Sequence, residues 1–252
     1  MIDLAPLTRL GLLLVRPGML VLSAPAFGGT YAPPMLKVGL VVMLALSMLP
    51  AAPLPSVDTP VALTTVIVRE VMIGLSLGFG MRAITAGAEF AGYLAGYQLG
   101  FAYASVVDPQ AGARNTVLST MYGLVALMVF FAIDGHHLFL RGLAQSYHAM
   151  PIGPGHVDGS LAASVGRIFA MIFTVGVQLS APVVIVLLVV ELGLGLMGRA
   201  APMLNLMSQA FPVRLIVGLL ALAAVVRVIP DVIVRVVPHA LEIAARLAAA
   251  FR

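Results

Sequence analysis

Small residues recur at every fourth position between residues 88 and 104, and this spacing strongly constrains how the chain can fold. Residues four apart lie on one face of a helix, so the stripe forms a flat surface that another helix backbone can approach closely. Two glycines in the preceding apolar run repeat the pattern. The sequence therefore predicts close helix packing at Gly74, Gly78, Ala88, Gly92, Gly96, Gly100 and Ala104.

The composition places the chain in the membrane class. Of its 252 residues, 61% are hydrophobic and only 10% are charged, whereas a soluble domain carries about 25% charged residues. The absence of cysteine excludes disulfides, thiolate metal sites and a cysteine nucleophile. The net charge of +4 comes from single scattered residues rather than a basic run, which argues against nucleic-acid binding. The first residues lack a basic region followed by a cleavage site, which argues against a removable signal peptide.

Apolar runs separated by Gly/Pro-rich turns predict a helical architecture. A membrane-spanning helix needs about 20 apolar residues. Runs approaching that length cover residues 7–27, 36–50, 61–80, 83–107, 115–133, 161–190 and 213–229. Since no alternating strand pattern is present, we expect an all-α, membrane-associated fold of helical hairpins, forming a single domain over residues 1–252.

The C-terminal segment, residues 230–252, has a different pattern from the other runs. Apolar residues such as Ile233, Val237 and Ala240 recur on one side of a helix, while Arg235 and His239 lie mostly on the other side. This pattern is typical of an amphipathic helix. We expect the helix to lie on a membrane or on a partner rather than to span.

Charged residues interrupt the apolar runs. Each would cost about 2.5–3.5 kcal/mol at the centre of a membrane helix, so we expect buried ion pairs between neighbours. The candidate pairs are Arg69 with Glu70, Arg82 with Glu89, and Glu191 with Arg199. The same carboxylates could instead carry protons in a transporter, although structural neutralisation is the simpler interpretation.

The sequence offers little catalytic chemistry. His136 and His137 are adjacent, so on a helix they point about 100° apart, which argues against one shared metal ion. Asp134, just before them, is expected to cap a helix that restarts there. No Ser-His-Asp spacing or phosphate-binding loop is present. We therefore expect no catalytic, cofactor or metal site. Pro182 is expected to bend its helix or to serve as a hinge.

Four segments in order resemble the FliR family of flagellar type III export proteins. These segments are residues 101–110 (FAYASVVDPQ), 130–137 (FFAIDGHH), 150–153 (MPIG) and 191–205 (ELGLGLMGRAAPMLN). The resemblance covers nearly the whole chain. One departure is Asp134, where flagellar members often carry Asn, but both residues cap and turn.

The resemblance implies a non-enzymatic structural subunit of the flagellar protein export gate, in the bacterial inner membrane at the flagellar basal body. Family members join several copies of FliP-like and FliQ-like membrane subunits in a helical cone. Much of that cone is raised out of the bilayer. It passes unfolded flagellar subunits outward, with an FlhB-like switch protein and an FlhA-like channel protein on its cytoplasmic side. No cofactor is implied.

The resemblance also assigns a channel plug to one loop. By position, that loop comprises Val107, Asp108, Pro109, Gln110, Ala111, Gly112, Ala113, Arg114 and Asn115. From the residues alone, a short Pro/Gly loop between apolar helices is usually a connector.

Two alternatives to the flagellar gate remain. The first is the equivalent subunit of a virulence injectisome, which would share the fold and differ in cargo. The second is a small-solute secondary transporter, which predicts an inverted repeat with paired broken helices. The sequence has one such break, at Pro182, without a mirrored counterpart.

Overall fold

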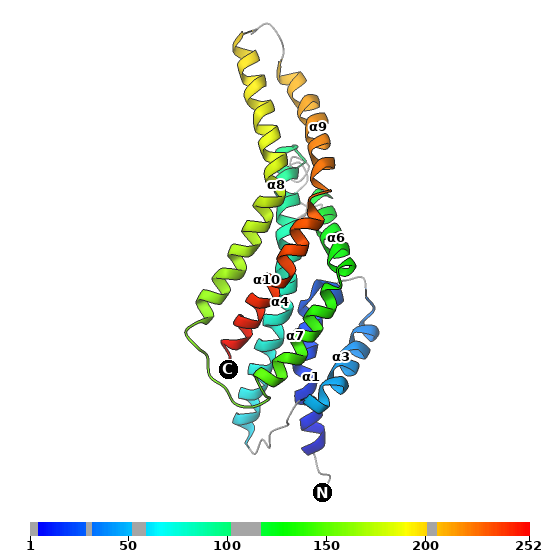
Figure 1. Cartoon of the computed structure of the whole chain (residues 1–252), viewed down its shortest axis with the longest axis vertical. Coiled ribbons are helices and arrows are strands. Elements are labelled where there is room, and N and C mark those ends of the chain that lie inside the picture. The colour runs from blue at the N-terminus through cyan, green and yellow to red at the C-terminus, as the bar shows by residue number, and fades with distance from the viewer. Residues whose placement is uncertain (1–4, 29–31, 52–58, 102–116, 201–205) are drawn as a thin grey trace. The chain divides into compact units, whose positions relative to one another are not determined.

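The computed structural model describes residues 5–28, 32–51, 59–101, 117–200 and 206–252. Every regular element in these ranges is helical (Figure 1), which confirms the all-α expectation. The elements are α1 (Ala5–Ser23), α2 (Pro25–Gly28), α3 (Pro34–Met48), the 3-10 turn η1 (Leu49–Ala51), α4 (Pro60–Gln98), α6 (Val117–Ala132), α7 (Gly135–Ala149), α8 (Leu161–Ala200), α9 (Leu206–Val225) and α10 (Ile229–Ala249).

Two of these helices, α4 and α8, are each long and apolar enough to cross a membrane. Two bent helix pairs, α6 with α7 and α9 with α10, also qualify if each pair is one broken span, with bends of 69° and 52°. The described residues therefore hold two to four candidate spans, by length and composition.

The chain forms two compact units. Unit 1 comprises residues 1–84, 130–171 and 236–252, and unit 2 comprises residues 85–129 and 172–235. Four helices, α4, α6, α8 and α10, pass from one unit into the other. The units are therefore not separate stretches of sequence, and the single domain over residues 1–252 stays a prediction.

The core of unit 1 is built around α1, which lies beside α3 (Figure 1). Apolar residues from α1, α3, α4 and α7 meet there because each helix turns an apolar stripe inward. The buried members are Leu12, Leu13, Leu20, Val21, Ala45, Val66, Leu77, Leu143, Tyr147 and Ile152. This core surrounds the charged cluster described below.

The 39-residue helix α4 is one continuous element, although the sequence predicts separate runs at 61–80 and 83–107. No proline follows Pro60 within it, and Arg82 does not interrupt the helix. At its start, the hydroxyl of Thr59 accepts a hydrogen bond from the backbone N–H of Ala62 at 3.3 Å. A capped start and an interior without proline thus account for its length.

The end of α4 is set by Gly100. This residue adopts a φ of +85°, and the N–H of Phe101 donates to the carbonyl of Gly96 at 2.9 Å. This 6→1 bond is the Schellman stop, which favours a glycine-like backbone. Gly100 therefore lies beyond the helix and ends it, whereas the sequence places it within a continuous packing stripe.

Unit 2 contains the last third of α4, most of α6 and α8, all of α9 and the start of α10. The buried stripe of α8 in this unit recurs at four-residue spacing. Phe90 of α4 meets Phe173 of α8 edge to face, with ring centroids 5.3 Å apart. Beyond this contact region, α8 and α9 lie side by side (Figure 1). The buried stripe comprises Val175, Leu179, Val183 and Leu187.

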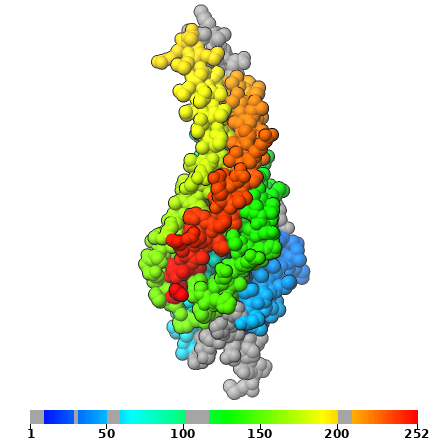
Figure 2. All heavy atoms as spheres, in the orientation of Figure 1, coloured from blue at the N-terminus to red at the C-terminus, as the bar shows by residue number. Residues whose placement is uncertain are grey.

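The C-terminal helix α10 confirms the expected amphipathic pattern but buries its apolar side in the chain's own core. In unit 1, Ala240 and Ala244 contact Gly80 of α4, and Leu241 contacts Gly142 of α7. Figure 2 shows the outer surfaces of α7 and α10 running next to each other. The apolar face of α10 in this unit therefore covers the protein itself rather than a membrane or a partner.

Candidate functional site

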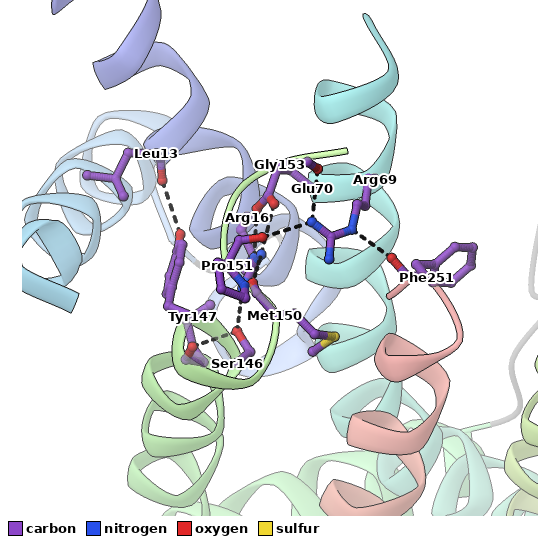
Figure 3. Close-up of polar contacts among 11 residues, drawn as sticks. Leu13, Arg16, Arg69, Glu70, Ser146, Tyr147, Met150, Pro151, Gly153 and Phe251 are labelled. Carbon is purple, nitrogen blue, oxygen red and sulfur yellow. Dashed lines mark hydrogen bonds and ion pairs between the residues drawn. The ribbon is translucent and has the colours of Figure 1, made fainter. Parts of the chain in front are cut away.

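A fully buried charge cluster lies at the centre of unit 1. Arg16 of α1 and Glu70 of α4 both have side chains that are 0% exposed. Arg16 Nε donates to Glu70 Oε2 at 2.7 Å, and Arg16 Nη2 donates to Glu70 Oε1 at 2.8 Å (Figure 3). This two-pronged pairing matches the planar fork of the guanidinium to both carboxylate oxygens.

The remaining donors of Arg16 reach α7 and the loop that follows it. Nη1 donates to the hydroxyl of Ser146 at 2.9 Å, and Nη2 also donates to the carbonyl of Met150 at 2.9 Å. The guanidinium lies over the ring of Tyr147, 4.2 Å from its centroid. One buried side chain thus links α1 to α4, to α7 and to the loop after α7. Because Arg16 is buried, loss of its partner Glu70 would leave a costly unpaired charge.

Arg69, the neighbour of Glu70 in sequence, makes a separate set of contacts. Its Nε donates to the carbonyl of Phe251 at 2.7 Å (Figure 3). Its Nη1 donates to the carbonyls of Pro151 and Gly153 at 2.8 and 2.9 Å. Arg69 therefore holds the loop after α7 and the C-terminal residues on α4.

Backbone hydrogen bonds join the same two segments directly. His156 N–H donates to Arg252 O at 2.9 Å, and Asp158 N–H donates to Ala250 O at 2.8 Å. These bonds satisfy main-chain groups that no helix pairs. The loop after α7 and the end of α10 are therefore joined through both side-chain and backbone contacts.

The partner of Glu70 differs from the one that the sequence suggests. Adjacent residues on a helix do not face each other, so Arg69 points to backbone carbonyls while Arg16 reaches Glu70 from another helix. Arg16 is not among the charged residues for which the sequence predicts a buried ion pair. Its signal is nevertheless present, as an arginine inside the apolar run of α1.

The second predicted acidic site also pairs across helices. Glu191 of α8 forms an ion pair with Arg214 of α9 at 2.7 Å, with both side chains about one-third exposed. Arg199, its predicted partner, is exposed in the last turn of α8. Arg82 is exposed and Glu89 is half-buried, and both interact within the protein.

Two predicted packing glycines lie where α4 crosses α1. A Cβ at Gly74 would lie 2.5 Å from the carbonyl oxygen of Arg16, and one at Gly78 would lie 2.9 Å from that of Leu20. Glycine at this crossing lets two backbones approach without a side chain between them.

A third predicted glycine lies where α4 meets α6. A Cβ at Gly92 would collide with the backbone of Leu118. Ala88 and Gly96, on the same predicted stripe, are buried. The stripe on α4 is thus a surface of close helix contact in unit 2.

Other predicted positions fall outside the described residues. The loop from Val107 to Asn115 lies there, and so does Ala104. Helix α8, which is described, continues through Pro182, and this residue is exposed. A hinge at that position stays a prediction.

The α6–α7 junction confirms the predicted restart of a helix at Asp134. Asp134 is the N-cap of α7, with φ +56°, but its side chain makes no capping hydrogen bond. Its carboxylate instead lies 3.3 Å from His137 Nδ1. The rings of His136 and His137 have centroids 4.1 Å apart. The two side chains therefore lie closer together than the expected angle of about 100° between adjacent helical residues suggests. The ligand atoms of these three residues lie within 4.8 Å of one another, but Asp134 and His137 are well exposed.

The fold and these sites define an all-α protein of the membrane class, with close glycine contacts between helices and a buried Arg16–Glu70 pair. The family model described as "Bacterial export proteins, family 1" matches residues 7–240. The chain therefore belongs to that family, which confirms the resemblance found in its sequence.

Individual relatives cover most of the chain. It is 32% identical over 219 residues to the flagellar biosynthetic protein FliR of Pectobacterium carotovorum, covering 86% of this chain and 83% of the relative. It is 31% identical over 219 residues to FliR of Escherichia coli K12, with the same coverage. It is also 29% identical over 199 residues to the Yop proteins translocation protein T of Yersinia pestis, covering 77% and 74%.

Proposed function

We propose that this protein is a non-enzymatic structural subunit of the flagellar type III protein export gate. In this role it helps to form the channel that passes unfolded flagellar subunits across the bacterial inner membrane, at the flagellar basal body. The observation that carries the proposal is the family match over residues 7–240, together with FliR relatives that align with 86% of the chain.

The surface of unit 2 supports a role inside a larger assembly. On α8, Leu188, Val189 and Leu192 are each more than half exposed, and on α9 so are Ile216 and Leu220. Only 22% of the apolar window of α8 is buried within the chain. Such a surface is completed by lipid or by other apolar helices. FliP-like and FliQ-like subunits are the proposed neighbours, with an FlhB-like switch protein and an FlhA-like channel protein as further partners.

A gene deletion with complementation tests the proposal. Cells lacking the protein should be bald by electron microscopy, with hook and filament proteins retained inside, and the intact gene should restore both. Normal flagella with lost effector secretion would instead support the injectisome subunit, which is kept as the second candidate because of the Yersinia relative. Normal flagella and normal secretion would overturn both.

The proposed contacts of unit 2 can be mapped because the chain has no cysteine. A single Leu192→Cys variant carries one reactive thiol on the exposed side of α8. We expect it to cross-link to a neighbouring gate subunit in membranes. The matched control is Val157→Cys, which replaces a side chain that is 64% exposed on the loop after α7 in unit 1. Equal cross-linking of both positions would contradict a specific interface on α8.

The loop from Val107 to Asn115 is the proposed channel plug, as the family resemblance implies. Deleting Gln110 to Ala113 should leave assembly of the gate intact but let small ions leak, because a shorter loop closes the channel less well. Ion conductance of the purified gate in a planar bilayer measures this. Unchanged conductance in a fully assembled variant would mean that the loop is only a connector.

A further inference from the structure

An almost wholly apolar groove of about 310 Å³ opens on the surface of unit 1. Its walls come from α1, α4, α8, α10 and the residues just after α10. The residues that matter here are Met72, Leu75, Phe79, Leu161, Val165 and Phe251. Two of these walls belong to α4 and α8, the two described helices that are each long and apolar enough to cross a membrane alone.

The groove is long enough for part of one lipid chain. Its wall on α4 runs from Met72 to Phe79, and these seven helical steps rise by about 10 Å at 1.5 Å per residue. The hydrocarbon core of a bilayer is about 30 Å thick, so this distance is about one-third of it. A groove of this length suits a segment of one acyl chain within one leaflet.

A cation with a donor that has no partner among the described residues lies one helical turn before the α4 wall of the groove. Arg69 is one helical turn before Met72, and its Nε is bonded to the carbonyl of Phe251, which lines the groove. Arg69 is 9% exposed. Among the described residues, none accepts a hydrogen bond from its Nη2, which carries no dashed line in Figure 3.

The charge of the cluster also favours an anion. Glu70 is the one buried carboxylate among the described residues, and both of its oxygens are taken by Arg16. Arg69 itself donates only to carbonyl oxygens, so two arginines share one carboxylate and leave one positive charge in excess. A buried cation without a paired anion is unfavourable, and an anionic group beside Nη2 would stabilise the site.

We propose that this groove binds an anionic phospholipid. One acyl chain lies between α4, α8 and Phe251, and the phosphate accepts a hydrogen bond from Arg69 Nη2. The proposal does not depend on the function proposed above. It commits to a lipid rather than to a free anion, because the apolar walls add binding energy that inorganic phosphate cannot use.

Native mass spectrometry of the purified, delipidated protein tests the proposal. Dioleoyl phosphatidylglycerol and dioleoyl phosphatidylcholine are added separately, since they share their chains and differ in net charge. We expect at least fivefold more retained phosphatidylglycerol. Equal retention of the two lipids, or a thermal shift with inorganic phosphate as large as that with the anionic lipid, would overturn the proposal.

Two variants of α8 separate the groove from the general surface. Val165→Phe fills the groove, whereas Ala163→Phe places the same ring on the opposite, exposed side of the helix. Retention of phosphatidylglycerol should fall at least fivefold in the first variant and stay unchanged in the second. In folded Arg69→Gln protein, the preference for the anionic lipid should shrink. Equal retention by both Phe variants, or displacement of the lipid when partner subunits bind, would contradict the assignment of the groove to lipid.

Discussion

The charged pairs of units 1 and 2 differ in burial and in the number of hydrogen-bond partners. In unit 1, the Arg16–Glu70 pair is completely buried, and Arg16 also bonds to Ser146 and Met150. In unit 2, the Glu191–Arg214 pair is about one-third exposed. Unit 1 therefore supplies its own counter-charges and hydrogen-bond partners for this pair, whereas the environment of the pair in unit 2 depends on what surrounds the chain.

The apolar surfaces do not divide between the units in the same way as the charges. Unit 1 buries apolar helix faces around α1 and against α10, but its helix α3 also exposes large side chains such as Met35 and Met43. In unit 2, α8 and α9 expose large side chains such as Leu192 and Leu220. The buried charges of unit 1 thus serve its internal structure, whereas exposed apolar helix faces suited to assembly occur in both units.

The largest expected effect comes from removing the buried carboxylate. Glu70→Ala leaves Arg16 buried without its partner, and breaking such a pair costs about 3–5 kcal/mol. We expect the variant to melt well below the parent protein in detergent and to accumulate poorly in membranes. Thermal unfolding and immunoblotting of membrane fractions measure both quantities.

The matched control is Glu242→Ala. Glu242 pairs with Arg246 on the exposed side of α10, and both side chains are more than half exposed. Exposed pairs contribute about 0–1 kcal/mol, so this variant should behave like the parent protein. If Glu70→Ala were equally harmless, the buried cluster would not hold unit 1 together.

Packing at a glycine contact is expected to have the next largest effect. In Gly92→Ala, the added methyl group meets the backbone of Leu118, which cannot move aside as a side chain can. Overpacking of this kind costs about 1–3 kcal/mol, and thermal unfolding in detergent measures the loss. The control is Gly193→Ala on α8, where nothing lies within 4 Å of the new atom and the gain in helix propensity is about 1 kcal/mol. Equal melting temperatures would show that the Gly92 contact is incidental.

The sequence predicts the helices better than it predicts their pairing. Apolar runs and Gly/Pro turns indicate nearly every helix because burial and backbone conformation are local properties. The joining of two runs into α4 is the exception. A charged residue such as Arg82 suggests a boundary, but a helix without an internal proline continues through it.

The charge cluster could be predicted only in part. Glu70 and Arg69 stand out as charges in an apolar run, but the partner of Glu70 is Arg16, 54 residues away. The spacing of residues along one helix carries no information about which other helix packs against it. For the same reason, the sequence pairs Glu191 with a residue of its own helix, whereas Arg214 approaches from α9.

The smallest expected effect concerns the Glu191–Arg214 pair, and it tests the comparison between the two units most directly. A double-mutant cycle of Glu191→Gln and Arg214→Gln isolates the energy of the pair from other effects of each change. In the isolated subunit in detergent we expect a coupling energy below about 1 kcal/mol, because partly exposed charges are screened by water and salt. The coupling should weaken further when the salt concentration is raised. A coupling energy of several kcal/mol that does not change with salt would contradict the contrast between the two units. It would require the pair in unit 2 to be as shielded from solvent as Arg16 and Glu70.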